Sequence, residues 1–120
     1  MLTLEQFKAA RATLQGVIRT TSLIHSPALS KACGNQVYLK PENMQVTGAY
    51  KIRGAYYKIS TLSEEEKARG LITASAGNHA QGLAYAAQAA GVPATIVMPT
   101  TTPLVKVNNT KDYGARVILQ

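Results

Sequence analysis

The residues of this sequence that could carry chemistry gather in two short stretches, ENMQVTGAYKIRGA at residues 42–55 and SAGNHAQG at residues 75–82. Lys51 follows the turn signal Thr47-Gly48, so we expect it in the first turn of a helix. The positive end of a helix dipole disfavours an ammonium ion, and only a neutral amine attacks a carbonyl carbon. The first stretch therefore predicts a nucleophilic amine at Lys51.

The neighbours of Lys51 favour this interpretation over that of an ordinary surface lysine, which is the alternative. Gly48 and Gly54 are expected to permit the close approach of other backbone. Tyr50 supplies an aromatic ring, and Arg53 lies two residues further on. Glycines, an aromatic ring and an arginine around a lysine are more typical of a binding site than of a solvent-exposed surface without a function.

The second stretch is predicted to join the carboxyl end of a strand to the start of a helix, where open α/β sheets bind ligands. Gly77 allows a tight turn whose amides can point at an anion. Ser75 and Asn78 add side-chain donors for a carboxylate or phenolate oxygen. The alternative is a strand–helix turn in which Ser75 or Asn78 only caps the helix, because capping uses the same residue types.

His79 is a candidate general base, and the alternative is that it only donates a hydrogen bond or packs. With His25, His79 and Cys33 as the only His and Cys residues, no metal-ligand cluster is expected. The acids bunch at residues 64–66, so no Ser-His-Asp arrangement can be argued. Neither a phosphate-binding P-loop nor a GxGxxG dinucleotide fingerprint is present.

Composition limits the partners and the compartment. The net charge of +7 over 120 residues allows an anionic partner, but one Phe and no Trp leave little for a nucleic-acid stacking surface. The lone Cys33 cannot form an intrachain disulfide, which fits a reducing compartment. No stretch approaches the length of a membrane span and no signal-peptide core opens the chain. We expect a cytoplasmic protein that binds neither nucleic acid nor membrane.

The order of the elements predicts an α/β fold. Short apolar strands at residues 71–74, 94–98 and 115–119 alternate with helices at 78–90 and 102–114, which indicates a parallel sheet. Before them the patterns predict helices at residues 4–14, 26–34, 48–60 and 64–69, and extended segments at 20–24 and 36–40. The capping boxes Thr3–Gln6 and Ser63–Glu66 mark two of the helix starts. We expect an open three-layer αβα parallel sheet that is incomplete within these residues.

Together, the two stretches resemble the threonine dehydratase and serine racemase branch of the fold type II pyridoxal phosphate enzymes, which are tryptophan synthase β-like in fold. The resemblance covers nearly the whole chain, including MPTTTPLVK and the strand YGARVIL. It implies an N-terminal portion of such an enzyme. Residues 1–45 would belong to its large domain, and residues 46–120 would form a truncated small βαβαβ domain carrying both stretches.

The resemblance also implies roles for particular residues. Lys51 would bind pyridoxal 5'-phosphate as an internal aldimine and later move the proton of the substrate's α-carbon. Tyr50, where the family usually has Phe, would lie beside the cofactor ring. Asn78 would donate a hydrogen bond to the ring hydroxyl oxygen. The substrate's α-carboxylate would be bound by the turn of Ser75, Ala76, Gly77, Asn78 and His79.

Three departures from the family pattern refine these expectations. The usual Ser-Phe before the lysine is Ala49-Tyr50 here, which loses a hydroxyl. Ala76 stands where racemases of this branch carry a second serine, which favours dehydration over racemisation. The loop that binds the cofactor's phosphate would lie beyond Gln120.

The expected activity is β-elimination from L-threonine or L-serine, giving 2-oxobutanoate or pyruvate and ammonia. Such an enzyme would act on a small amino acid, as a homo-oligomer, within amino-acid metabolism such as isoleucine biosynthesis. The alternatives are a serine racemase or related β-elimination enzyme, and a catalytically silent α/β fragment that does not bind the cofactor by itself.

Overall fold

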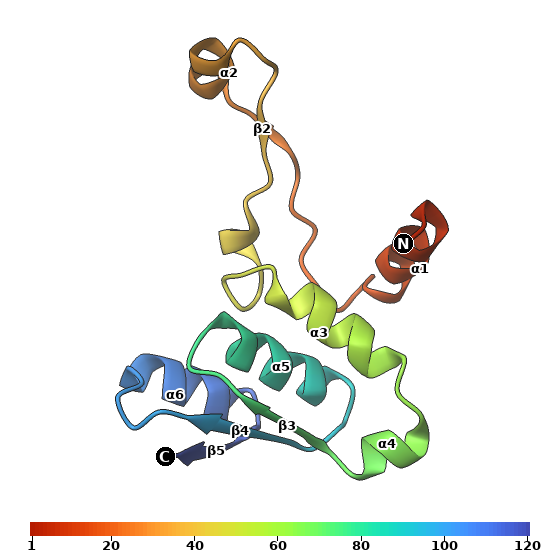
Figure 1. Ribbon diagram of the computed structural model, residues 1–120, viewed down its shortest axis with the longest axis vertical. Coiled ribbons are helices and arrows are strands. Elements are labelled where there is room, and N and C mark those ends of the chain that lie inside the picture. The colour runs from red at the N-terminus through yellow and green to blue at the C-terminus, as the bar shows by residue number, and fades with distance from the viewer.

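A computed structural model describes all 120 residues as a small parallel sheet, a set of helices and an N-terminal extension (Figure 1). The elements in chain order are α1 (Leu4–Thr13), β1 (Ile24–His25), α2 (Pro27–Cys33), β2 (Tyr38–Leu39), the 3-10 turn η1 (Glu42–Met44), α3 (Lys51–Ser60), α4 (Glu64–Ala68), β3 (Leu71–Ala74), α5 (Asn78–Ala89), β4 (Ala94–Met98), α6 (Leu104–Asp112) and β5 (Arg116–Leu119).

The sheet has the predicted three parallel strands, in the order β3-β4-β5. Ile96 and Met98 of β4 are almost fully buried because α5 and α6 cover that face of the sheet. The opposite face lacks a helical layer, and Ile72 of β3 is 76% exposed there. Two of the three expected layers therefore lie within these residues.

The helix starts confirm the capping predictions. Both predicted capping boxes form, at Thr3 with Gln6 before α1 and at Ser63 with Glu66 before α4. Each satisfies two backbone N–H groups that would otherwise lack partners. These local signals were sufficient because the capping groups lie only three residues apart.

Two predicted boundaries need correction. The helix predicted from Gly48 begins three residues later, at Lys51, because Gly48 has φ of 69°, in the left-handed region that helices exclude. The extended segments 20–24 and 36–40 shrink to the two-residue strands β1 and β2, which pair antiparallel with each other. Neither strand joins the main sheet.

The segment around β1, α2 and β2 projects away from the sheet as an arm (Figure 1). The radius of gyration is 16.6 Å, against about 14 Å expected for a compact domain of this length. The arm and α1 expose Leu4, Phe7, Leu23, Ile24, Leu29, Tyr38 and Leu39. The chain does not itself cover this apolar surface. None of its helices combines the length and apolarity needed to cross a bilayer.

Candidate active site

Lys51 is the first residue of α3, directly after the N-cap residue Tyr50, as the sequence predicted. Ile52 and Ile59 anchor the helix because their side chains are buried beneath it. The side chain of Lys51 is exposed and forms no ion pair. Its Nζ lies 5.2 Å from the centroid of the Tyr50 ring. The amine is therefore free of any carboxylate that would hold it.

The turn between β3 and α5 has the geometry of a binding loop more than of a capped helix. Gly77 is the N-cap residue of α5, and no side chain caps that helix. The Ser75 hydroxyl instead accepts a hydrogen bond of 3.3 Å from the Gly77 N–H. The interpretation in which Ser75 or Asn78 caps the helix is therefore wrong. The amides at the start of α5 keep their capacity to bind an anion.

The remaining predicted residues of this turn differ in exposure. Ala76 is half-buried, whereas Asn78 and His79 are exposed, and neither of these two side chains has a hydrogen-bond partner in the chain. His79 thus has neither the packing nor the hydrogen bond of the alternative interpretation. No group of three or more His, Cys, Asp or Glu side chains is placed to hold a metal ion.

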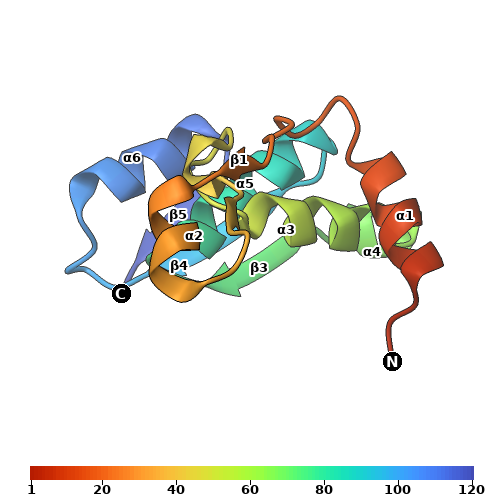
Figure 2. The same cartoon turned by 90° about the horizontal axis from the view of Figure 1, so that it is seen from above.

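The fold brings the two stretches to the same end of the molecule. Helices α3 and α5 lie side by side and run in the same direction, so that Lys51 and Asn78 begin neighbouring helices (Figures 1 and 2). An open pocket of about 410 Å³ adjoins the turn, at the carboxyl ends of the strands. Its lining residues are Ala74, Ser75, Ala76, Val97, Met98, Pro99 and Gln120.

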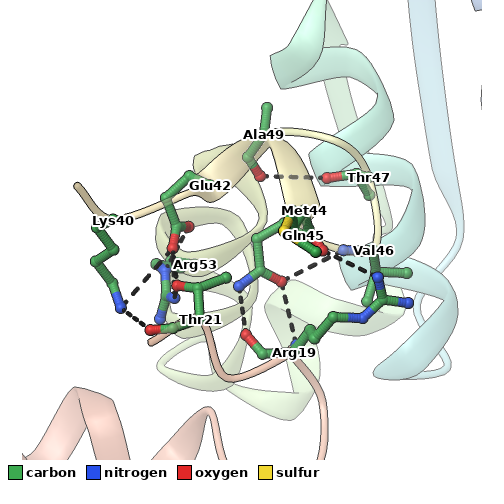
Figure 3. Close-up of polar contacts among 10 residues, drawn as sticks. All are labelled: Arg19, Thr21, Lys40, Glu42, Met44, Gln45, Val46, Thr47, Ala49 and Arg53. Atoms are coloured by element: carbon green, nitrogen blue, oxygen red, sulfur yellow. Dashed lines mark hydrogen bonds and ion pairs between the residues drawn. The ribbon is translucent and has the colours of Figure 1, made fainter. Parts of the chain in front are cut away.

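A polar cluster of Thr21, Lys40, Glu42 and Arg53 fixes α3 against the base of the arm (Figure 3). Both carboxylate oxygens of Glu42 accept hydrogen bonds of 2.8 Å from the Arg53 guanidinium. The Thr21 hydroxyl donates to Glu42 at 2.6 Å, and the Lys40 ammonium donates to the Thr21 carbonyl at 2.7 Å. Bidentate pairs of this kind are strong and directional.

The same cluster changes the titration of its acid. The pKa of Glu42 is lowered from 4.5 to about 2, chiefly because the Arg53 guanidinium donates hydrogen bonds to its carboxylate; burial opposes this shift, and the hydrogen bond from the Thr21 hydroxyl adds to it. The pKa of Arg53 is raised, chiefly by its hydrogen bonds to Glu42. The pair is therefore charged throughout the neutral pH range.

A second polar contact lies beside this cluster at the arm base. The buried side-chain amide of Gln45 accepts from the backbone N–H of Arg19 at 3.1 Å and donates to the carbonyl of the same residue. This pairing satisfies a side chain that is only 4% exposed. Residues 42–45 thus tie the chain before Lys51 to the incoming segment at residues 19–21.

This framework was not predicted from the sequence. Arg53 was recognised without its partner, because Glu42 is eleven residues away and Thr21 thirty-two. The close backbone approach expected at Gly48 and Gly54 does not occur, because a Cβ at either position would meet nothing within 4 Å. Glu42 is the only acid in the stretch at residues 42–55, which also contains Arg53, and this was the signal from which the ion pair could have been predicted.

Comparison with known proteins identifies the family. The family model described as "Pyridoxal-phosphate dependent enzyme" matches residues 14–120. The chain belongs to this family. An L-threonine ammonia-lyase from Thermotoga maritima is 57% identical over 120 residues, which are all of this chain and 30% of that protein. A catabolic L-threonine dehydratase from Staphylococcus aureus is 54% identical over 122 residues, covering all of this chain and 35% of its own length.

Solved structures of the family share the fold. Serine racemase from Dictyostelium discoideum superposes with a TM-score of 0.91 at 37% identity, covering 98% of this chain and 38% of that one. A threonine deaminase isoform from Solanum lycopersicum gives 0.80 at 38% identity, covering 99% and 36%. The chain thus spans about a third of the length of the relatives it matches. The expected fold type II architecture is confirmed.

The residues present fit the family's cofactor. Pyridoxal phosphate requires a primary amine, hydrogen-bond donors for its oxygens and a pocket that accepts a ring. Lys51 supplies an exposed amine without a carboxylate partner, and Asn78 supplies an exposed amide without a hydrogen bond. The pocket beside the Ser75 turn is largely apolar, and its lining residues do not include Lys51, Tyr50 or Asn78. The amine and the donor set agree with the family assignment.

Proposed function

We propose that the protein containing this chain is an L-threonine dehydratase that converts L-threonine or L-serine to 2-oxobutanoate or pyruvate with release of ammonia. The observation that carries the proposal is the 57% identity to an L-threonine ammonia-lyase over all 120 residues. The solved serine racemase of Dictyostelium discoideum is more distant, at 37% identity.

In this proposal, Lys51 would hold the cofactor covalently through Nζ. Once the substrate's amino group has displaced Nζ from the cofactor, the freed amine would take the proton from the substrate's α-carbon. Pyridoxal phosphate supplies an electron sink for the pair left behind when that carbon–hydrogen bond breaks. The Tyr50 ring would lie beside the cofactor ring, and the Asn78 side chain would donate to the ring hydroxyl oxygen. These roles are supported by the exposure of Lys51, Tyr50 and Asn78 at the starts of neighbouring helices.

The substrate would be oriented by the turn before α5. The Ser75 hydroxyl, the half-buried Ala76 and the backbone amides of Gly77, Asn78 and His79 would form the binding site for the α-carboxylate in this proposal. The absence of a side-chain cap on α5 supports it, because the amides that a cap would occupy remain available. The Gly77 amide would exchange its hydrogen bond with the Ser75 hydroxyl for one with the carboxylate. His79 is assigned to carboxylate binding and not to proton transfer.

The test is production of 2-oxobutanoate from L-threonine by the full-length protein and its Lys51→Ala variant. Loss of the proton-transfer group is expected to lower kcat by roughly 10²–10⁴-fold. Lys58→Ala is the matched control, because it removes an exposed lysine from the last turn of the same helix. A full-length protein that makes no 2-oxobutanoate, or a fully active Lys51→Ala variant, would contradict the proposal.

Serine racemase is the second candidate, supported by the TM-score of 0.91 to such an enzyme. Ala76 argues against it, because a methyl group cannot move a proton on the opposite face of the substrate. Chiral chromatography of the products from L-serine separates the two activities. A dehydratase releases pyruvate, and a racemase accumulates D-serine.

The activity is proposed for the longer protein and not for these 120 residues alone. The relatives are about three times as long as this chain. We therefore propose that the 120 residues by themselves bind the cofactor weakly and are catalytically inactive. We place residues 1–45 with a large domain and residues 46–120 in a small one. A cytoplasmic homo-oligomer is proposed, and the catabolic name of the Staphylococcus aureus relative favours a degradative role over isoleucine biosynthesis.

A further inference from the structure

Gly82, the last residue of the stretch SAGNHAQG, is buried in the second turn of α5, against the first turn of α3. A Cβ at this position would lie 3.0 Å from the backbone nitrogen of Ile52, 3.1 Å from the carbonyl carbon of Lys51 and 3.2 Å from its Cβ. Two of these atoms are backbone and cannot rotate away. Any side chain at residue 82 would therefore move the first turn of α3 by a few tenths of an ångström.

The close approach explains why a glycine stands inside this helix. Glycine is unfavourable in a helix interior compared with alanine, and Gly82 does not have the positive φ that would require it. Gly54 in α3 is a useful contrast, because a Cβ there would meet nothing within 4 Å. Gly82 is thus the position at which the packing of α3 on α5 demands the smallest residue.

The first turn of α3 is also held on its other sides. The Ile52 side chain is fully buried, and the next residue, Arg53, is tied to Glu42 by two hydrogen bonds. The backbone of Lys51 is therefore positioned by the contacts of the neighbouring residues Ile52 and Arg53, and not by the Lys51 side chain. Gly82 lies one helical turn, about 6 Å along the axis, from Asn78 at the start of α5.

We propose that Gly82 is a positioning residue for Lys51. By letting the two helices approach this closely, it sets the distance between the Lys51 amine and the Ser75–His79 turn. The inference rests on the proposed function of Lys51, but the contact itself does not. A shift of the lysine relative to the turn would slow proton transfer while leaving the carboxylate-binding amides in place.

The test compares Gly82→Ala with Gly54→Ala in the full-length protein. Misplacing a reacting group by 1 Å costs up to 10²-fold, so a shift of a few tenths is expected to lower kcat about tenfold, with KM within about twofold. A crystal structure of Gly82→Ala is expected to show the first turn of α3 displaced from α5. Gly54→Ala is expected to keep the native kcat and the native helix position.

The outcomes separate this inference from the proposed function. An undisplaced α3 or a native kcat in Gly82→Ala would overturn the inference, as would equal loss of kcat in Gly54→Ala. Full activity in Lys51→Ala would overturn the proposed function, whereas the structure of Gly82→Ala still tests the contact. Should Gly82→Ala unfold, Gly54→Ala is added to it, because alanine raises the helix propensity of α3 and offsets part of the lost stability. The kcat and the crystal structure are then measured on this double variant, Gly54→Ala/Gly82→Ala.

Discussion

Lys51 is held by its backbone and not by its side chain. The amine is exposed and unpaired, while Ile52 beside it is fully buried and Arg53 is bound to Glu42. The amine is therefore available for chemistry, and the neighbouring residues Ile52 and Arg53 hold the backbone of Lys51 in position. Removing the amine should therefore affect activity and stability very differently.

Lys51→Ala is expected to change the free energy of unfolding by less than about 0.5 kcal/mol, because it truncates an exposed side chain outside the core. Urea denaturation of the native and variant proteins measures the difference. A loss of several kcal/mol would show that Lys51 is a structural residue, and the catalytic interpretation of its activity loss would then fail.

The Glu42–Arg53 pair is expected to make stability depend on pH. The pKa of Glu42 is lowered to about 2 in the folded protein, so its contribution is complete above pH 4.5 and is lost as the pH falls toward 2. The contribution is at most about 3–4 kcal/mol, at 1.36 kcal/mol per unit of pKa shift from 4.5 to about 2.

Glu42→Gln is the variant that isolates this effect. Its deficit in unfolding free energy relative to the native protein should be large at pH 6 and should shrink at pH 3. A deficit that is equal at the two pH values would show that the carboxylate charge of Glu42 contributes nothing.

At the scale of elements, the turn before α3 decides where the helix begins. Gly48 has φ of 69°, and a Cβ there would meet no other atom within 4 Å. Position 48 therefore requires glycine only because of its backbone conformation. Gly82 shows the opposite case, in which space and not φ excludes a side chain.

Gly48→Ala is expected to lower the free energy of unfolding by about 1–2 kcal/mol, the cost of a left-handed conformation in a residue with a Cβ. Gly54→Ala is the control and should raise stability by up to about 1 kcal/mol, because alanine favours the helix. Denaturant unfolding of the two variants measures both. Equal effects would contradict the assignment of strain to Gly48.

Local signals made most of the elements predictable from the sequence. The capping boxes at Thr3 and Ser63 and the three apolar strands were recognised because their partners lie within a few residues. The position of Lys51 at a helix start was predicted in the same way. The start of α3 was placed three residues early because a turn and a first helical turn share similar residue types.

Contacts between distant segments could not be predicted in this way. The pairing of Glu42 with Arg53 and Thr21 depends on how the arm returns to α3, and the close approach at Gly82 depends on how α3 crosses α5. The absence of a side-chain cap at Gly77 is likewise a matter of loop geometry. The site was found from its residue types, and its supporting framework was not.

At the scale of the whole molecule, two apolar surfaces lack a cover. One is the sheet face that bears Ile72, and the other is the projecting arm with Leu23 and Ile24. Exposed apolar patches of this kind promote association. The sheet face is the better target for a variant, because Ile72 is 76% exposed and contributes little to the core.

The 120-residue chain is expected to self-associate as its concentration rises, and Ile72→Lys is expected to weaken that association by placing a charge on the bare sheet face. Sedimentation velocity over a concentration series measures both. A native chain that stays monomeric throughout the series would refute the prediction.

Lys51 is proposed to be the residue that binds the cofactor. Borohydride reduction of the full-length protein with pyridoxal phosphate, followed by mass spectrometry of its peptides, locates the modified lysine. We predict a single modified peptide carrying the cofactor on Lys51, and none at that position in Lys51→Ala. Modification of another lysine in place of Lys51 would contradict the claim.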